Sequence, residues 1–368
     1  AQPGAGQRPF GRRRGCRRRA QQHQRGQPHA AEGGLRVAFH LRLVAAAIGP
    51  AHACCARPVR AAGAAPQDPA TFFIALAGPT IATHGSEEVK KRFLRPMFTG
   101  EEKWCQLFSE PGSVSDFAGL SAKGVKDGEE WIVNGQKVWT TLAHLSKWGL
   151  LVVRTDAEAV KHAGLTAVVV DMHGPGVEGR PLRQMTGEAE FNEVYFTDVR
   201  IPQNEMLGSV GDGWRVSLTT LMNERVSIGG AIPGKGSGAI RDAVKVWNGL
   251  SADQRDPSTR DELMKLWVRA ELLRLTNIRA SQNRKMGDPG PEGSIAKLAM
   301  AELHKDIYSF AVSMMGADGM LFPSGYQMIR PEHAMGLENP QKAFLRSRAN
   351  SIEGGTSEVM RNILGERV

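Results

Sequence analysis

The sequence predicts an α+β fold with an N-terminal helical part, a middle antiparallel β domain and a C-terminal four-helix bundle. Apolar runs of strand length, punctuated by Pro and Gly, fill residues 104–210, and apolar residues recur at helical spacing over 211–368. Of the 368 residues, 41% are hydrophobic and 23% are charged. These ordinary fractions exclude collagen-like, coiled-coil and wholly disordered chains.

Residues 1–69 differ from the rest of the chain in charge. They hold twelve Arg, no Lys and two acids, a local net charge of +10, so the remaining 299 residues sum to −1. Four interpretations stay open for this segment: a nucleic-acid-binding arm, an export signal, an atypical helical domain, or residues outside the evolved sequence, because Arg, Ala, Gly and Pro are typical of GC-rich DNA translated out of frame. We expect the segment to be poorly ordered, with no nucleic-acid partner.

Cysteine usage indicates the compartment. Three of the four cysteines lie in residues 1–69 and only Cys105 lies in the body. This usage argues against a disulfide framework and fits a reducing compartment, so we expect a cytoplasmic location. No apolar run approaches the ~20 residues of a membrane span. We expect neither a membrane span nor a metal site.

Residues 70–103 are interpreted as the remnant of an N-terminal helical domain. The pattern at 86–94 predicts a short amphipathic helix, with Ser86 as its N-cap and acids in its first turn. Pro96 and Gly100 are predicted to end it.

Residues 104–210 are predicted to form the β domain. Asn134-Gly135 lies between two apolar stretches of 130–139 and predicts a hairpin turn there. Further strands are predicted at 149–154, 165–171 and 192–199.

From Trp214 onward, apolar residues three to four positions apart predict the helices of the C-terminal bundle, residues 211–368. Linkers rich in Pro and Gly are predicted at 287–293 and 321–325. The predicted helical stretches begin at 214, 262, 294 and 357.

Two motifs resemble those of the acyl-CoA dehydrogenases. The first comprises residues 105–116 with 134–141, and the second comprises residues 352–361. Residues 196–202 and 211–214 follow the family pattern in the same order. The resemblance implies an acyl-CoA dehydrogenase-like fold that binds FAD.

The resemblance also assigns residues to the flavin site. Trp139 would cover the ring, and Thr141 would hydrogen-bond near the N5 atom that accepts hydride. Alternatively, Trp139 is an ordinary core aromatic of a strand. The residues assigned to the cofactor are Gln106, Leu107, Phe108, Ser109, Trp139, Thr140, Thr141, Thr356 and Glu358.

For the substrate, the resemblance implies that Ser115 hydrogen-bonds the CoA part. Val114 stands where the family has a small glycine, so the alternative of a simple turn serine stays open. Met222, Arg225 and Gly354 are expected near the thioester.

The resemblance leaves two glutamates as candidates for the base that removes the α-proton. In many family members the base directly precedes the Gly-Thr of the C-terminal motif, a position that is Gly354 here. A subset places it on the first helix of the C-terminal domain, where this chain has Glu224 followed by Arg225. We favour Glu224, because Gly354 would leave room for its side chain, and keep Glu353 as the second candidate. A solvated Glu–Arg surface pair is the structural alternative.

Two family stretches are missing. Residues 254–260 lack the Arg-x-Gln-Phe-Gly pattern that reaches a neighbouring subunit's flavin pyrophosphate, and residues 313–319 lack Gln-x-x-Gly-Gly. Both losses concern the adenine half of FAD, so they imply a divergent cofactor site or a different partner subunit.

The resemblance therefore implies an FAD-dependent acyl-CoA dehydrogenase of lipid metabolism and fatty acid β-oxidation. It would form a homo- or hetero-oligomer (dimer or tetramer) and pass electrons to an electron-transfer flavoprotein. The alternatives are a non-catalytic partner subunit, a nucleic-acid-binding protein acting through residues 1–69, and an oxidase or monooxygenase on the same fold.

Overall fold

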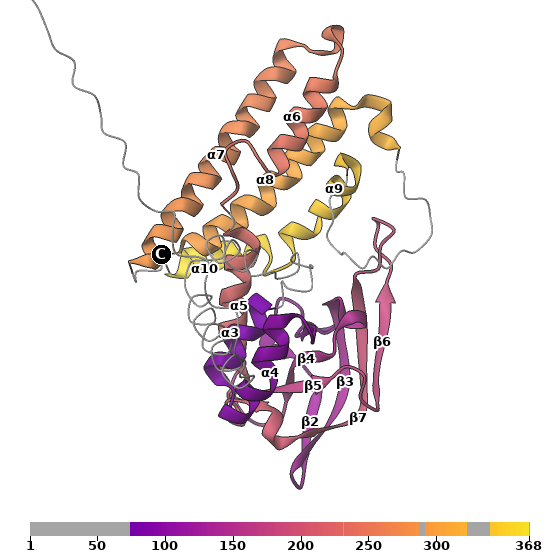
Figure 1. Cartoon of the computed structure of the whole chain (residues 1–368), viewed down its shortest axis with the longest axis vertical. Helices are drawn as coiled ribbons and strands as arrows, with labels where there is room; N and C mark the ends of the chain where they lie inside the picture. Colours follow the sequence, from indigo (N-terminus) through magenta and orange to yellow (C-terminus); the bar gives the residue numbers. More distant parts are fainter. Residues whose placement is uncertain (1–73, 231, 287–290, 322–338, 368) are drawn as a thin grey trace, which may run out of the picture. The chain divides into compact units, whose positions relative to one another are not determined.

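The computed structural model describes residues 74–230, 232–286, 291–321 and 339–367, all within one compact unit, His40–Val368. Among these residues, two helices precede an eight-stranded sheet, and six helices follow it (Figure 1). The predicted α+β class is confirmed. The predictions for residues 1–69, and most of those for the two linkers, fall outside the described residues.

The elements have the following bounds. The helices are α3 (Ile74–His84), α4 (Glu87–Thr99), α5 (Gly213–Gly229), α6 (Ala239–Gly249), α7 (Pro257–Lys285), α8 (Glu292–Met314), α9 (Pro340–Ser347) and α10 (Ser357–Arg367). The strands are β1 (Trp104–Leu107), β2 (Lys123–Asp127), β3 (Glu130–Thr141), β4 (Trp148–Arg154), β5 (Leu165–Asp171), β6 (Val177–Leu182), β7 (Phe191–Pro202) and β8 (Met206–Leu207).

Helix α4 begins as predicted and ends later than predicted. The Ser86 side chain accepts a hydrogen bond from the Val89 N–H, and Gly100 ends the helix in the left-handed region at φ 77°. The prediction that Pro96 ends the helix is wrong. Phe93 and Met97, on either side of Pro96, are both buried in the core, and this packing keeps the proline within the helix.

The hairpin predicted at Asn134-Gly135 is wrong. Residues 130–141 form one continuous strand, and the turn joining β2 to β3 lies at Gly128, at φ 62°. Gly135 lies instead at a register shift between β3 and β7. A Cβ there would lie 2.6 Å from the Ala122 Cβ, so the glycine serves a close approach of strands.

The sheet runs in the order β6-β7-β3-β2-β4-β5-β8, and β1 pairs with β4. Most pairs are antiparallel, as predicted, but β1 and β2 both pair parallel with β4. Strands β4 and β5 are continuously apolar because both of their faces are buried. One face packs against side chains of β3 and β7, and the other lies under α3, α4 and α5.

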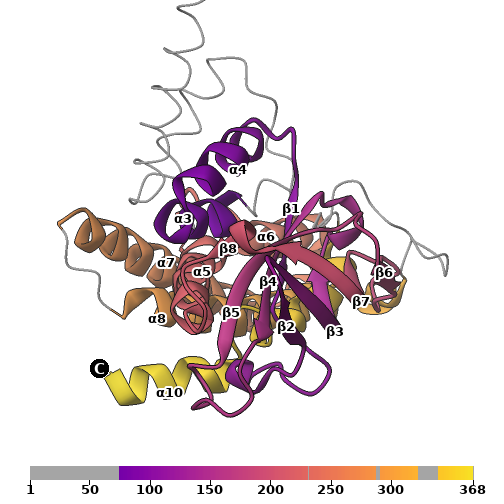
Figure 2. The same cartoon turned by 90° about the horizontal axis from the view of Figure 1, so that it is seen from below.

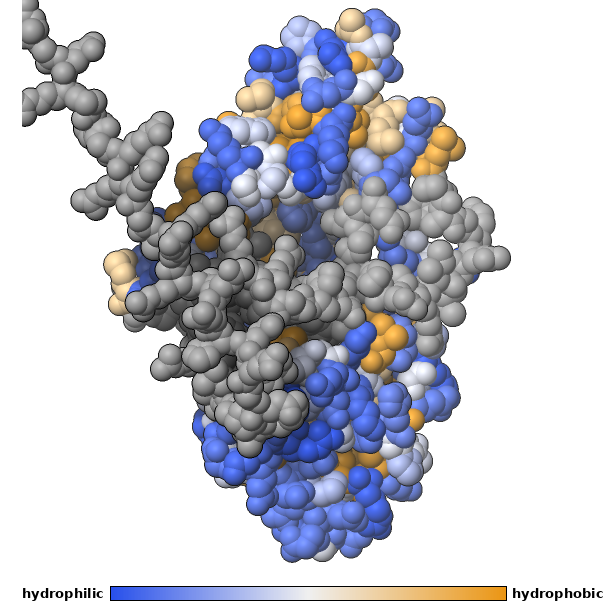
Figure 3. All heavy atoms as spheres, in the orientation of Figure 1, coloured by the Kyte–Doolittle hydropathy of each residue, from blue (hydrophilic) through white to orange (hydrophobic). Residues whose placement is uncertain are grey.

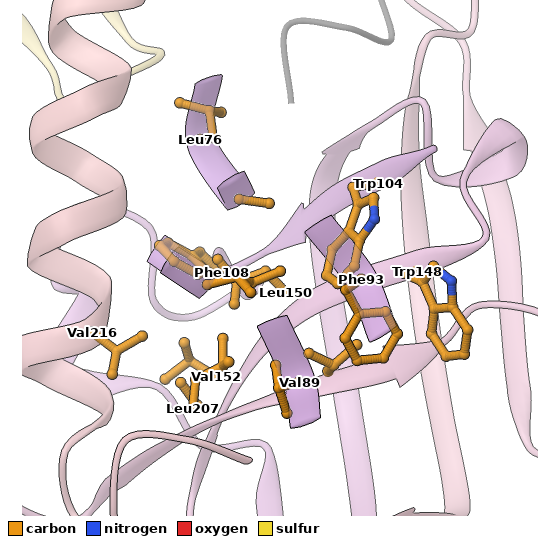
Figure 4. Close-up of a cluster of buried hydrophobic side chains, with 14 of the residues drawn as sticks. Leu76, Val89, Phe93, Trp104, Phe108, Trp148, Leu150, Val152, Leu207 and Val216 are labelled. Carbon is orange, nitrogen blue, oxygen red and sulfur yellow. The ribbon is translucent and has the colours of Figure 1, made fainter. Parts of the chain in front are cut away.

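Aromatic side chains dominate the core beneath the N-terminal helices. Phe93 of α4 packs edge to face against Trp104 and Trp148, with ring centroids 5.3 and 5.0 Å apart. Figure 4 shows Val216 of α5 reaching the same cluster beside Val152. Helix α3 packs against both α4 and α5 (Figure 2), so this core holds α5 against the sheet.

Helix α8 is the centre of the C-terminal helices. It packs against α5, α7 and α10, which coincide with the helical stretches predicted to begin at 214, 262 and 357, and also against α6 and α9. The sequence did not predict α6 or α9 as separate helices. Because α8 contacts both α5 and the segment before α10, it brings the two candidate bases into one region.

A buried ion pair lies inside the first family motif. Lys137 of β3 is 0% exposed, and its Nζ lies 2.9 Å from Glu110 Oε1 and 3.1 Å from the Phe108 carbonyl oxygen. Burial lowers the pKa of the Lys137 ammonium to about 8, against the opposing effect of Glu110. The Glu110 carboxylate also accepts hydrogen bonds from the N–H groups of Ser121 and Ala122. The pair thus fastens the 106–110 segment to β3.

We expect Lys137→Met to lower the free energy of unfolding by about 3–5 kcal/mol, because it leaves the Glu110 carboxylate buried and unpaired. Chemical denaturation measures this loss. Lys161→Met is the control: it breaks the exposed Lys161–Asp116 pair and should cost about 0–1 kcal/mol. Equal losses in the two variants would contradict this account.

Candidate active site

Helix α5 carries a stripe of small and polar residues that leads to Glu224. Gly213, Ser217, Thr220 and Glu224 lie three or four positions apart and therefore share one face of the helix. A Cβ on Gly213 would lie 2.6 Å from the backbone of β5, so α5 begins in close contact with the sheet. The Thr220 hydroxyl hydrogen-bonds that of Thr80 on α3 at 2.8 Å.

Met222, which was expected near the thioester, projects from another face of α5 than Glu224, as does Leu218. Leu218 and Met222 are 37% and 63% exposed, because they project from other faces of the helix. Met222 is therefore an exposed side chain one half-turn before Glu224. Arg225, next along the helix, is partly buried.

The Glu224 carboxylate is enclosed by groups from other parts of the chain. Gln106 of β1 donates a hydrogen bond to it, and a Cβ built on Gly354 would lie 3.8 Å from Glu224 Oε1. Burial raises the pKa of this carboxyl to about 7, assisted by the negative charge of Glu353 and opposed by the Gln106 hydrogen bond and nearby cations. A carboxyl with this pKa suits a general base near neutral pH.

Glu353 is held in an ion pair. Arg346 of α9 lies between two carboxylates, with its Nη2 2.9 Å from Glu353 Oε2 and its Nε 3.2 Å from Glu190 Oε1. Glu190 is fully buried, just before β7. The Glu353 carboxylate is thus directed to Arg346, whereas the space above Gly354 is taken by Glu224.

The two segments assigned to the flavin ring lie side by side. The Val138 N–H donates a hydrogen bond to the Ser109 carbonyl oxygen at 2.9 Å. Trp139 follows with φ 59°, a left-handed conformation that is rare for a bulky residue. The residue is 54% exposed, and its indole meets Phe191 edge to face at 6.2 Å. The alternative that Trp139 is a core aromatic is therefore wrong.

These residues fit a flavin. A strained backbone that presents an exposed indole is typical of a ligand site, and the buried Thr140 hydroxyl has no hydrogen-bond partner among the described residues. Thr356 accepts a hydrogen bond from Val359 N–H at the start of α10, two residues beyond Gly354. Glu358 lies on the exposed side of α10, paired with Arg361.

Ser115 lies at the other end of α5 from Glu224. It is exposed, two residues before Phe117, whose ring stacks on Trp214 at 6.0 Å. Val114 beside it is exposed too. Trp214 and Glu224 are ten residues apart along the helix, about 15 Å, so the structure does not bring Ser115 to the carboxylate.

Sequence reasoning missed two residues of this region, Lys297 and Arg346. Neither belongs to a motif. The only signal for Lys297 was a charged residue within a largely apolar helical stretch, and nothing in the sequence indicated Arg346. Lys297 of α8 is fully buried and donates hydrogen bonds to the carbonyl oxygens of Asn350 and Gly355. Both residues hold the 349–355 segment.

The stretches that depart from the family pattern serve local structure here. Asp256 accepts hydrogen bonds from the N–H groups of Ser258 and Thr259 and so caps the start of α7. Residues 316–320 form a short 3-10 helix after α8. None of the helices in the described ranges has both the length and the apolar character needed to cross a membrane.

Comparison with known proteins agrees with this fold. Residues 105–199 match the model of the acyl-CoA dehydrogenase middle domain, and residues 211–368 match that of the C-terminal domain. Acyl-CoA dehydrogenase IpdE1 of Mycobacterium tuberculosis is 36% identical over 295 residues, which cover 80% of this chain and 73% of that protein. The chain belongs to the acyl-CoA dehydrogenase family and is an oxidoreductase of that family, as the motifs predicted.

Two solved structures extend the comparison. The ChsE4–ChsE5 complex from Mycobacterium tuberculosis aligns with a TM-score of 0.69 at 28% identity, covering 83% of this chain and 78% of that chain. The Tcur3481–Tcur3483 steroid acyl-CoA dehydrogenase aligns with a TM-score of 0.71 at 25% identity, covering 80% and 75%. Both are complexes named for two proteins.

The raised pKa of Glu224 predicts a pH-dependent effect of Glu224→Gln on stability. The Glu224 carboxyl has a pKa of about 7 in the folded state and 4.5 in the unfolded chain, so the folded state binds this proton more tightly. The wild type therefore loses stability as the pH rises from 4.5 to about 7. At pH 8 the variant should be more stable by up to about 3 kcal/mol, and below pH 4.5 the difference should vanish. Denaturation at several pH values measures it, and a difference that does not change with pH would contradict the burial of an ionisable Glu224.

Proposed function

We propose that the chain catalyses FAD-dependent α,β-dehydrogenation of an acyl-CoA thioester to the trans-2-enoyl-CoA, with an electron-transfer flavoprotein as electron acceptor. The observation that carries the proposal is the position of the half-buried Glu224 side chain. Its carboxylate is hydrogen-bonded to Gln106 of the flavin motif and lies against Gly354 of the C-terminal motif. Family membership supports the reaction class. The single free, buried Cys105 among the described residues is compatible with the cytoplasm.

In this proposal Glu224 takes the α-proton of the thioester. Its pKa near 7 leaves a substantial ionised fraction at neutral pH while keeping the carboxylate basic. Gln106 holds the carboxylate by a hydrogen bond, and Gly354, which has no side chain, leaves room for the Glu224 side chain. Arg225 lies beside the base and would face the CoA part, as Ser115 would at the far end of α5.

FAD would be held by the 106–109 and 139–141 segments, and when bound it supplies a hydride acceptor for the β-carbon of the substrate. Trp139 would lie against the ring, and the Thr140 hydroxyl would find a partner there. Thr356, two residues beyond Gly354, would approach from the C-terminal side. Glu358 would contact the cofactor only at the edge of the site, because its side chain is exposed and paired with Arg361.

We further propose that the active form is a heteromer with a second acyl-CoA dehydrogenase-type subunit. Two observations support it: the missing pyrophosphate motif at 254–260, and the two-protein complexes among the similar structures. The helices could offer the contact surface, since Figure 3 shows hydrophobic residues among the C-terminal helices. On α7 the exposed apolar residues at helical spacing are Met264, Val268, Leu272 and Leu275.

The similar structure named as a steroid acyl-CoA dehydrogenase makes a steroid-derived thioester the substrate class that we propose first. A straight-chain fatty acyl-CoA is the comparison. Bleaching of the flavin absorbance under anaerobic conditions, with each thioester in turn, distinguishes them. Faster bleaching by the straight-chain thioester would assign the enzyme to fatty acid oxidation.

We expect Glu224→Gln to lower the rate of flavin reduction by substrate on the order of 10²–10⁴-fold, because the amide keeps the shape of the side chain and cannot accept the proton. Anaerobic stopped-flow absorbance measures the rate. Glu353→Gln is the matched control and should retain most of the rate, since that carboxylate is directed to Arg346.

The opposite pattern would assign the base to Glu353, and no loss in either variant would indicate a non-catalytic subunit. A rescue sharpens the test. Gly354→Glu in the Glu224→Gln background should restore part of the rate, by placing a carboxylate at the commoner family position. Because a Cβ at 354 would lie 2.8 Å from Ile228 Cδ1 and Gly354 has φ 64°, adding Ile228→Val should improve the rescue.

We expect the chain to retain FAD when co-expressed with its partner subunit and to retain less when expressed alone, because the chain lacks the family's pyrophosphate-binding motif. Absorbance near the flavin bands of the purified protein, with and without the partner, measures retention. A preparation that takes up no FAD in either case would refute the cofactor assignment.

A further inference from the structure

Lys297 is a fully buried lysine of α8 that the proposed chemistry does not use. Removing an ammonium from water costs several kcal/mol unless partners compensate for the lost hydration. Burial accordingly lowers the pKa of Lys297. A charge that is retained at this cost needs an explanation from its surroundings.

The hydrogen-bond partners of Lys297 are two backbone carbonyl groups. Its Nζ lies 2.9 Å from the Asn350 oxygen and 2.5 Å from the Gly355 oxygen. These carbonyls bracket the segment that contains Glu353 and Gly354. Because both partners are neutral, the charge of the ammonium is not cancelled by contact and acts on the carboxylates around it.

Lys297 and Glu224 meet at the space left by Gly354. A Cβ built on Gly354 would lie 3.7 Å from Lys297 Cε and 3.8 Å from Glu224 Oε1. Gly354 and Gly355 have φ values of 64° and 96°, a backbone that other residues adopt rarely. The two hydrogen bonds from Lys297 connect this left-handed pair to the rigid frame of α8.

We propose that Lys297 is a positioning residue for Glu224: its ammonium fastens the Asn350–Gly355 segment to α8, keeps the side-chain-free Gly354 against the carboxylate, and stabilises the ionised form of that carboxylate. This inference rests on the proposed role of Glu224. It gives a residue of α8 a role in positioning the base, and no sequence motif indicated this role.

The charges that face Glu224 come from several elements. Arg225 on its own helix and Lys297 on α8 favour ionisation, and Glu353 opposes it. The other elements packed against α5 present charges that are engaged elsewhere: His84 of α3 with Thr219, Arg154 of β4 with the Leu120 carbonyl, and Asp171 of β5 with Lys147. Of the two cations that favour ionisation of Glu224, Lys297 is fully buried and Arg225 is half-buried.

The test compares Lys297→Met with Lys305→Met, a control on the same helix whose lysine pairs with Glu302 instead. The first readout needs no activity: the pH midpoint of the stability difference between proteins with and without Glu224→Gln reports the ionisation of Glu224. We expect Lys297→Met to move this midpoint upward, by at most about one pH unit. The second readout is hydrogen exchange at the Ile352 and Glu353 amides, which should become faster.

An unchanged midpoint together with unchanged exchange would overturn the proposal. If Lys297→Met does not fold, Lys297→Gln decides, since its amide still reaches a carbonyl and lacks the charge: the midpoint should rise and exchange should stay slow. Failure of both variants to fold would assign a purely structural role and also overturn the proposal.

The flavin-reduction rate, measured in parallel, distinguishes this inference from the proposed function. If Glu224→Gln is still reduced by thioester, the base assignment fails while the midpoint shift in Lys297→Met can still be observed. If the base assignment holds, the pH profile of kcat/KM should move upward in Lys297→Met and stay in place in Lys305→Met.

Discussion

The proposed site depends on the bridge that the buried ion pair of Arg346 with Glu190 makes between two parts of the chain. Glu190 precedes a strand of the sheet and Arg346 lies on α9, so the bridge joins the β domain to the C-terminal helices. Glu188 and Lys342 form a second buried pair beside it, at 2.6 Å. Buried pairs of this kind resist separation because parting them leaves charges without water or partners. The segments proposed to hold FAD on one side and the Gly354 segment on the other are therefore held in one arrangement.

Within this arrangement, three groups act on the charges of Glu224 and of its neighbour Glu353. Arg346 neutralises Glu353, Lys297 acts on Glu224 across the space above Gly354, and Gln106 donates a hydrogen bond to the Glu224 carboxylate. Burial raises the pKa of Glu224 to about 7, against the opposing effects of the Gln106 hydrogen bond, Arg225 and Lys297. A buried glutamate without these opposing groups would have a still higher pKa, and a fully exposed glutamate would be a weaker base.

Sequence reasoning located the elements well where the local physics was unambiguous. The continuous apolar run at Leu165–Asp171 is β5, and Ser86 caps α4 through its side chain. The predictions from sequence were wrong where tertiary packing overrode a local signal. Asn134-Gly135 is the residue pair of a tight turn, yet the close approach of Ala122 uses that glycine inside a long strand. Pro96 is a helix breaker, yet the burial of Phe93 and Met97 keeps it helical.

The sequence by itself determined the family, the flavin motif and the pair of glutamates to consider, because these depend on short ordered patterns of residue types. Only the tertiary structure decided which groups surround each glutamate. Gly354 comes from a loop 130 residues beyond Glu224, and Lys297 and Arg346 come from two further helices. No local pattern encodes such distances, since pKa values and ion pairs arise from groups that the fold brings together.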